Sequence, residues 1–142
     1  MSARDRRLDV IVAGHRGDCA TARRHLADAD PTVRAAAVHA LERAHDLADD
    51  ELASAMTDTD AAVRRLGAEL AGRRPGTPLD RLLTDDDATV VEVAAWAAGE
   101  QEDVSDAVLD RLIELATDAE QPLVREAATA SLGAIGDPHG LP

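Results

Sequence analysis

A recurring segment constrains the fold of this chain more than any other feature of its sequence. The clearest copy is DADPTVRAAAVHALER at residues 28–43, and weaker copies occupy residues 58–73, 85–100 and 120–136. Each copy places acidic or amide residues before an apolar helical pattern. The valines at the same place in each copy, spaced by 30, 27 and 34 residues, are Val33, Val63, Val90 and Val124. A period in this range predicts an array of helical repeats, each packed on its neighbours.

The composition favours helices that pack closely together. Hydrophobic residues make up 45% of the chain, but Trp96 is its single aromatic residue. The apolar side chains are therefore mostly those of Ala, Leu and Val, and Ala and Leu are strong helix formers. Small side chains suit stacked helix pairs better than one large globular core. We expect a single repeat domain over residues 1–142.

Capping and stopping residues divide the chain into helices. The pattern predicts a short end helix at residues 5–13, stopped by Gly14, with an inner face formed by Leu8, Ile11 and Val12. Helix pairs are expected at about residues 18–44, 49–73, 77–99 and 105–136, followed by a frayed tail at residues 137–142. The later helix of each of the first three pairs has a predicted aspartate cap, and these caps are Asp30, Asp60 and Asp87.

The repeated unit D-x-D-x-x-V-R-x-x-A resembles HEAT repeats, in particular the short variety called PBS-lyase HEAT-like repeats. The third copy departs from the pattern because Val91 stands where arginine is expected, and the fourth has Gln121 in place of the capping aspartate. The resemblance covers about residues 18–136. It implies an all-α fold, a right-handed α-solenoid of about four HEAT-like helix pairs with an N-terminal end helix.

The resemblance also implies a ladder of aspartate and arginine side chains along the stack. An aspartate at a helix start accepts backbone N–H groups and can pair with a neighbouring guanidinium. The ladder would be interrupted at Val91, and we interpret its members as structural rather than functional. With the caps, these structural residues are Asp30, Arg34, Asp60, Arg64, Asp87 and Arg125.

The charge of the chain favours basic partners. The net charge is −13, and it is uneven: residues 1–34 carry seven Arg against five Asp, whereas residues 75–142 carry three Arg against fifteen acidic residues. Such a field repels nucleic-acid phosphates and anionic lipids. No apolar run approaches the roughly 20 residues that span a bilayer, so we expect a cytoplasmic protein. With Cys19 alone, we expect no disulfide and no thiolate metal cluster.

One set of residues is predicted to form a binding groove. The second helix of each pair lines the concave side of HEAT-like arrays, so positions two and six residues after the repeat valine should face the groove. The predicted partner-binding residues are Arg65, Glu69, Glu92 and Trp96, bordered by His39. An exposed Trp96 beside carboxylates would bind an arginine or lysine by cation–π contact and charge pairing. The alternative is that Trp96 fills space between alanine-rich helices.

Catalytic interpretations have less support. HEAT-like DNA glycosylases need a cleft inside a basic surface, and the acidic C-terminal half does not provide one. HEAT-like deoxyhypusine hydroxylases hold iron with His-Glu pairs, and this chain has no His-Glu dipeptide. We therefore expect no metal and no cofactor, and predict a non-enzymatic protein-binding module or adaptor, monomeric or weakly dimeric. The alternatives are a helper or chaperone-like subunit of a modifying enzyme, similar to bilin lyase subunits, and a factor that self-associates through an end of the stack.

Overall fold

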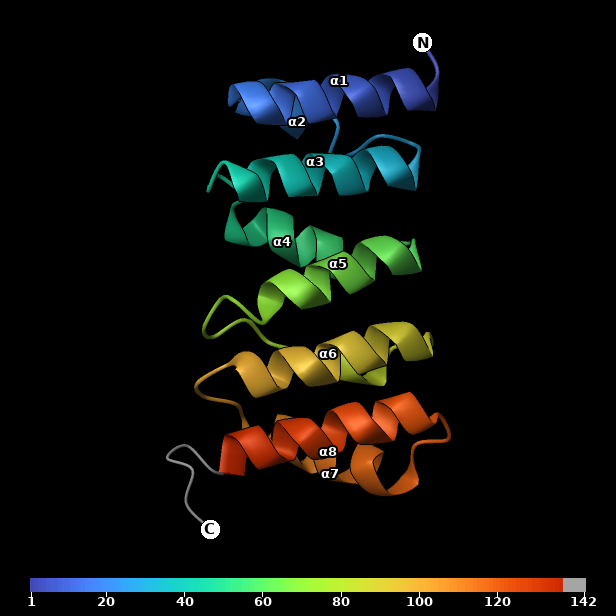
Figure 1. The fold of residues 1–142 in the computed structure, drawn as a ribbon, viewed down its shortest axis with the longest axis vertical. Helices are drawn as coiled ribbons and strands as arrows, with labels where there is room; N and C mark the ends of the chain where they lie inside the picture. Colours follow the sequence, from blue (N-terminus) through green and yellow to red (C-terminus); the bar gives the residue numbers. More distant parts are fainter. Residues whose placement is uncertain (137–142) are drawn as a thin grey trace. The chain divides into compact units, whose positions relative to one another are not determined.

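The computed structural model of the chain describes residues 1–136, so the predicted tail at 137–142 lies outside the described residues. Within that range all regular structure is helical, and no strand occurs (Figure 1). The helices are α1 (Ala3–Arg16), α2 (Cys19–Arg24), α3 (Pro31–Arg43), α4 (Asp49–Met56), α5 (Ala61–Ala71), the 3₁₀ helix η1 (Leu82–Thr84), α6 (Ala88–Glu100), α7 (Asp106–Asp118) and α8 (Pro122–Gly136). The predicted all-α class is confirmed.

The chain forms two compact units. Unit 1 is Met1–Leu66, and unit 2 begins at Gly67, so the boundary falls within α5. Unit 1 contains α1 to α4 with the first part of α5, and unit 2 contains the end of α5 with η1, α6, α7 and α8. The single domain expected over residues 1–142 stays a prediction.

Short polar side chains begin most of these helices. Asp30 accepts a hydrogen bond from the backbone N–H of Thr32, and Asp87 accepts one from that of Thr89, both at 2.8 Å. Asp60 does the same for Ala62 at 2.8 Å. Each bond satisfies a donor that the first helical turn leaves without a partner. The helix starts therefore follow directly from local sequence.

Helix α1 differs from the predicted end helix in length and in its buried face. Ser2 begins it with a capping box and Gly17, at φ 71°, ends it, so Gly14 lies inside the helix. The predicted inner face is wrong, because Leu8, Ile11 and Val12 are 49%, 42% and 45% exposed. The buried residues of α1 are Val10 and Ala13.

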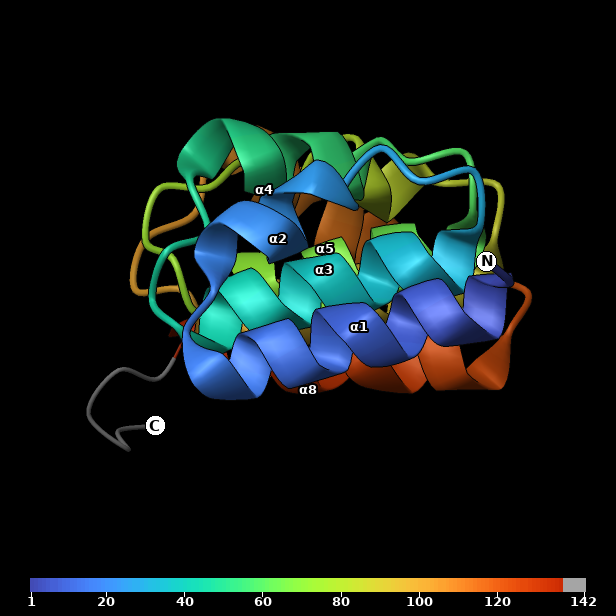
Figure 2. The same ribbon diagram turned by 90° about the horizontal axis from the view of Figure 1, so that it is seen from above.

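The packing of α1 against α3 explains this difference. Figure 2 shows that, within unit 1, α1 lies in the same layer as α3, while α2 and α4 form the other layer. A Cβ added at Gly14 would lie 2.9 Å from the Cβ of Ala40, so the glycine allows the two helices to approach closely. Helix α1 thus occupies the place of the second helix of a repeat.

In unit 2, the first helix of the third predicted pair is reduced to a turn and η1. The apolar residues Leu79, Leu82 and Leu83 of this segment are nevertheless at most 1% exposed. The Gln101 side chain is buried and donates through Nε2 to the carbonyls of Ala71, at 3.1 Å, and Thr77, at 2.9 Å. These bonds hold the loop that replaces the helix.

Glycines also set the helix spacing in unit 2. A Cβ at Gly72 would lie 3.0 Å from the Cβ of Ala97, and one at Gly99 would lie 2.8 Å from the Oγ of Ser131. Gly99 is therefore a contact residue between α6 and α8, and α6 continues to Glu100 instead of ending at this glycine.

Candidate interaction surfaces

Trp96 is exposed on the surface of unit 2. It lies on α6 with 44% of its area accessible, while its helix neighbours Ala94, Ala95, Ala97 and Ala98 are buried. The indole therefore does not fill the space between helices. Glu92 lies one helical turn before Trp96 and is half-buried, so a carboxylate and an indole lie on adjacent turns of the same face.

The remaining predicted groove residues divide between the units. Glu69 is exposed at the start of unit 2 and forms a long contact of 3.5 Å with Arg73, one turn later. Arg65 and His39 belong to unit 1, where Arg65 is half-buried and His39 is exposed. Glu69, Glu92 and Trp96 thus fall in unit 2, whereas Arg65 and His39 fall in unit 1.

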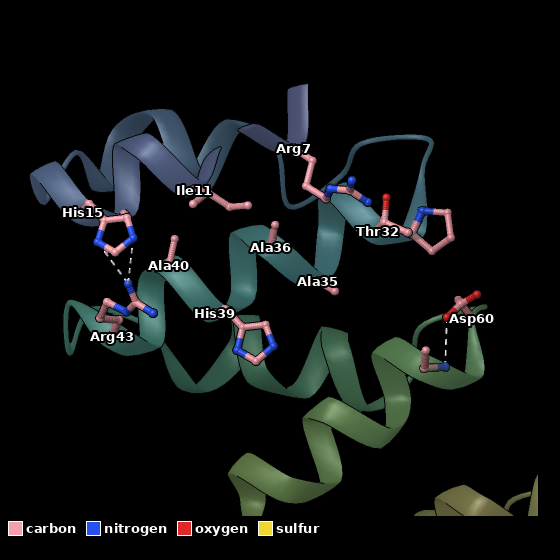
Figure 3. A pocket seen from close by; sticks show the side chains of 13 residues that line it. Arg7, Ile11, His15, Thr32, Ala35, Ala36, His39, Ala40, Arg43 and Asp60 are labelled. Atoms are coloured by element: carbon pink, nitrogen blue, oxygen red, sulfur yellow. Dashed lines mark hydrogen bonds between the residues drawn. The ribbon is translucent and has the colours of Figure 1, made fainter. Parts of the chain in front are cut away.

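Unit 1 carries a pocket that the sequence did not predict. Its volume is about 460 Å³, and Figure 3 shows it between α1, α3 and the first turn of α5. The floor is formed by alanines of α3 and by an exposed isoleucine of α1, and these residues are Ala35, Ala36, Ala40 and Ile11. Because alanine side chains are short, the facing helices leave a hollow where larger residues would fill the space.

Cationic and imidazole groups surround this apolar floor. Arg7 and His15 come from α1, and His39 and Arg43 come from α3 (Figure 3). The Nη1 atom of Arg43 lies 3.2 Å from each ring nitrogen of His15, so the guanidinium rests against the imidazole. Asp60 is the single carboxylate of the lining, and its Oδ1 accepts the N–H groups of Ala62 and Val63.

The arginines of the repeat bind carbonyls of the preceding loop, and Arg34 also binds a neighbouring carboxylate. Arg34 donates through Nη1 to the carbonyls of Asp28 and Ala29, and through Nε and Nη2 to the two carboxylate oxygens of Asp58, at 3.0 and 2.8 Å. Arg64 and Arg125 make the same two carbonyl contacts with their own preceding loops. A fork-shaped guanidinium is suited to such bidentate pairing.

The carboxylates of this ladder are not the predicted ones. The pairs join Arg34 to Asp58 and Arg6 to Asp28, whereas Asp30 and Asp60 serve as caps. The two aspartates of the first and second D-x-D motifs therefore have separate roles. In both motifs, the first aspartate pairs with an arginine and also accepts the backbone N–H of the second, at 2.9 Å in each case.

Arg6 extends the ladder into α1, where the sequence did not predict it. Its Nε and Nη2 donate to the carboxylate of Asp28 at 2.8 and 3.1 Å. The spacing in the sequence could have predicted this role, because Arg6 follows the capping Ser2 by four residues, as Arg34 follows Asp30. The Arg6 guanidinium, with the backbone N–H of Asp30, lowers the pKa of Asp28 to about 2.

In the pair formed by Arg34 and Asp58, the pKa of the aspartate is also lowered, although burial opposes this shift. Partial burial would by itself raise the pKa of Asp58, but hydrogen bonds from Arg34 and from the backbone of Asp60 bring it below its ordinary value. Both aspartates of the ladder are therefore held in the charged form at neutral pH.

Metal binding depends on how the metal-ligating side chains of the described residues are grouped. Residues 1–136 contain no group of three or more His, Cys, Asp or Glu side chains placed to hold a metal ion.

Burial, with a hydrogen bond to Asp46, raises the pKa of the Cys19 thiol, which makes it less nucleophilic than an ordinary cysteine. Among residues 1–136, no helix has the length and apolar character needed to cross a membrane.

The fold and surfaces define a class of helical repeat protein. Paired helices follow one another with capping aspartates, ladder arginines and close glycine contacts at recurring places in the repeat. Comparison with known families places this class more closely, because residues 75–142 match HEAT repeats. This match supports the predicted resemblance to HEAT repeat proteins, and the predicted all-α repeat fold is confirmed. No curated protein matches the chain.

Proposed function

We propose that this chain is a non-enzymatic protein-interaction module whose unit 2 binds a basic segment of a partner protein. HEAT repeats suggest a helical scaffold for protein interactions. The observation that carries the finer proposal is the exposed Trp96 beside Glu92 on α6. An exposed tryptophan in a chain that otherwise lacks aromatic residues is a strong candidate for an interaction anchor.

The charge of unit 2 supports a basic partner. From Gly67 onward the chain has five Arg against sixteen acidic residues, a net charge of −11. A guanidinium or ammonium group that stacks on the Trp96 indole would gain about 0.5 to 2 kcal/mol from the cation–π interaction. The Glu92 carboxylate can pair with the same cation, and the acidic field increases the rate of encounter.

The proposal can be tested through the fluorescence of Trp96, because it is the only tryptophan in the chain. An arginine-rich peptide should shift the emission and bind in a saturable manner, and a glutamate-rich peptide should not. Glu92→Arg should weaken binding about tenfold, equivalent to about 1.4 kcal/mol. Asp110→Arg is the matched control, because Asp110 is an exposed acid on α7 in the same unit and the charge change is identical.

The two variants separate a specific site from general charge attraction. Equal weakening by Glu92→Arg and Asp110→Arg would show that the peptide responds only to net charge, and the site on α6 would be rejected. Absence of binding by wild type at low salt would reject the basic-partner proposal altogether.

A further inference from the structure

We infer that the pocket of unit 1 is a second interaction surface with the opposite charge preference. It would bind an acidic protein segment in which a large aliphatic side chain stands next to a carboxylate. This inference goes beyond the proposed function, since it concerns another unit, another set of residues and another kind of partner.

The shape of the pocket fits an aliphatic group. Its volume of about 460 Å³ falls within the roughly 300 to 1,000 Å³ of ligand pockets. Ala35 and Ala36 are half-buried, and Ile11 is 42% exposed, so apolar surface remains in contact with water. Covering this surface with an aliphatic side chain would contribute about 25 cal/mol for each Å² of apolar area removed from water.

The charges around the pocket specify the polar part of the ligand. Within residues 1–136, Arg7 and Arg43 have no carboxylate partner, although the chain has 28 acidic residues against 15 arginines. Arg6, next to Arg7, is paired with Asp28. Two guanidinium groups without a carboxylate partner, beside an apolar hollow, would attract a carboxylate and hold it by charge-assisted hydrogen bonds.

The single acid of the lining does not cancel this preference. The Oδ1 atom of Asp60 accepts two backbone N–H groups at the start of α5, at 2.8 and 3.2 Å. Its charge is thus partly balanced by the helix terminus it caps. Two arginines with His15 and His39 remain around the rest of the lining.

The extent of the lining favours a protein segment over a small molecule. Besides the alanine floor, the lining includes Pro31 and Thr32 at the start of α3 and Ala62 at the start of α5. A ligand can therefore extend from α1 across α3 to α5, as an extended peptide or a helix would. Charge complementarity then selects an acidic segment.

The test uses the full chain and two fluorescein-labelled amphipathic peptides. Both carry leucines one helical turn apart, and they differ because one has glutamates where the other has lysines. Fluorescence anisotropy should show saturable binding of the glutamate peptide, weakened about tenfold by Arg7→Glu. Ala35→Leu, which fills the hollow without changing charge, should weaken it as well. Arg4→Glu is the matched control, because Arg4 is an exposed arginine of α1 outside the pocket lining.

Several outcomes would overturn the inference. Equal binding of both peptides, no binding of either, or equal weakening by Arg4→Glu and Arg7→Glu would each remove the proposed charge recognition. Saturable binding of dodecanoate in isothermal titration calorimetry, with no binding of the glutamate peptide, would assign the pocket to a small amphipathic acid. Concentration-dependent mass in solution that Arg7→Glu abolishes would assign it to a second copy of the chain.

Discussion

In unit 1, repeat arginines form ion pairs with aspartates. In unit 2, the equivalent position of α6 holds a valine, and that of α8 holds an arginine bound only to carbonyls among the described residues. Arg6 and Arg34 each pair with an aspartate of the next repeat motif. In unit 2 the corresponding position of α6 is Val91, which is 6% exposed, and Arg125 of α8 binds only loop carbonyls among the described residues. The repeat therefore tolerates a change from charged to apolar packing at one position without losing the helix.

The surfaces of the two units differ at equivalent positions of their repeat helices. Positions five and nine after the helix cap hold Arg7 and Ile11 in α1, but Glu92 and Trp96 in α6. Unit 1 has ten Arg against twelve acidic residues, while unit 2 has five against sixteen. One scaffold thus presents a cationic apolar pocket in one unit and an acidic aromatic surface in the other.

The largest expected effect concerns the ladder. Arg34→Ala should lower the free energy of unfolding by about 2 to 3 kcal/mol, because it removes two carbonyl contacts and leaves the largely buried Asp58 without its cation. Arg125→Ala, which removes carbonyl contacts only, should cost about 1 kcal/mol. Urea unfolding monitored by circular dichroism measures both, and equal losses would contradict the difference between the units.

A pair of glycine substitutions sharpens the account of helix spacing. Gly99→Ala should destabilise unit 2 by about 1 to 2 kcal/mol, because the new Cβ would lie 2.8 Å from the Oγ of Ser131. Gly133→Ala should instead stabilise α8 by about 0.5 to 1 kcal/mol, since the added Cβ would meet no described atom within 4 Å apart from its chain neighbours and the nearby backbone of its own helix. Thermal unfolding gives both signs, and stabilisation by both alanines would show that α6 and α8 do not depend on the close contact.

Lowering the pH should have a smaller effect on the stability of unit 1. The pKa of Asp28 is about 2 in the folded chain against an ordinary 3.8, so its pairing with Arg6 stabilises unit 1 above about pH 4. That contribution should be lost as the pH falls toward 2. Asp28→Asn should flatten the dependence of stability on pH over this interval, as measured by urea unfolding at each pH. Asp9→Asn, at an exposed position of α1, is the control, and identical profiles for both variants would remove Asp28 from the account.

Local signals predicted much of the fold. Asp30, Asp60 and Asp87 stand at helix starts because capping depends on a short polar side chain and the next few N–H groups. The buried face of α1 could not be derived in the same way. Leu8, Ile11 and Val12 have helical spacing, but which face is buried depends on where α3 packs, and Gly14 determines that contact.

The sequence predicts the exposure of Trp96 but neither the pocket nor the ladder carboxylates. Alignment of the repeat helices predicts that Trp96, six residues after its repeat valine, faces outward, and its side chain is exposed in the structure. The sequence does not predict the pocket, because α1 lacks the repeated D-x-D motif that would show its register with the other repeat helices. The ladder carboxylates lie two residues before the predicted ones, since the spacing alone does not show which aspartate of D-x-D caps the helix and which pairs with arginine.

The most direct test of the two surfaces is a nuclear magnetic resonance titration of the ¹⁵N-labelled chain with the arginine-rich peptide. The account predicts shifts of the Trp96 indole N–H and of the backbone around Glu92, with the signals of Ala35, Ala36 and His39 unchanged. Shifts centred on the pocket of unit 1, or small shifts spread over every acidic residue, would contradict the assignment of the basic partner to α6.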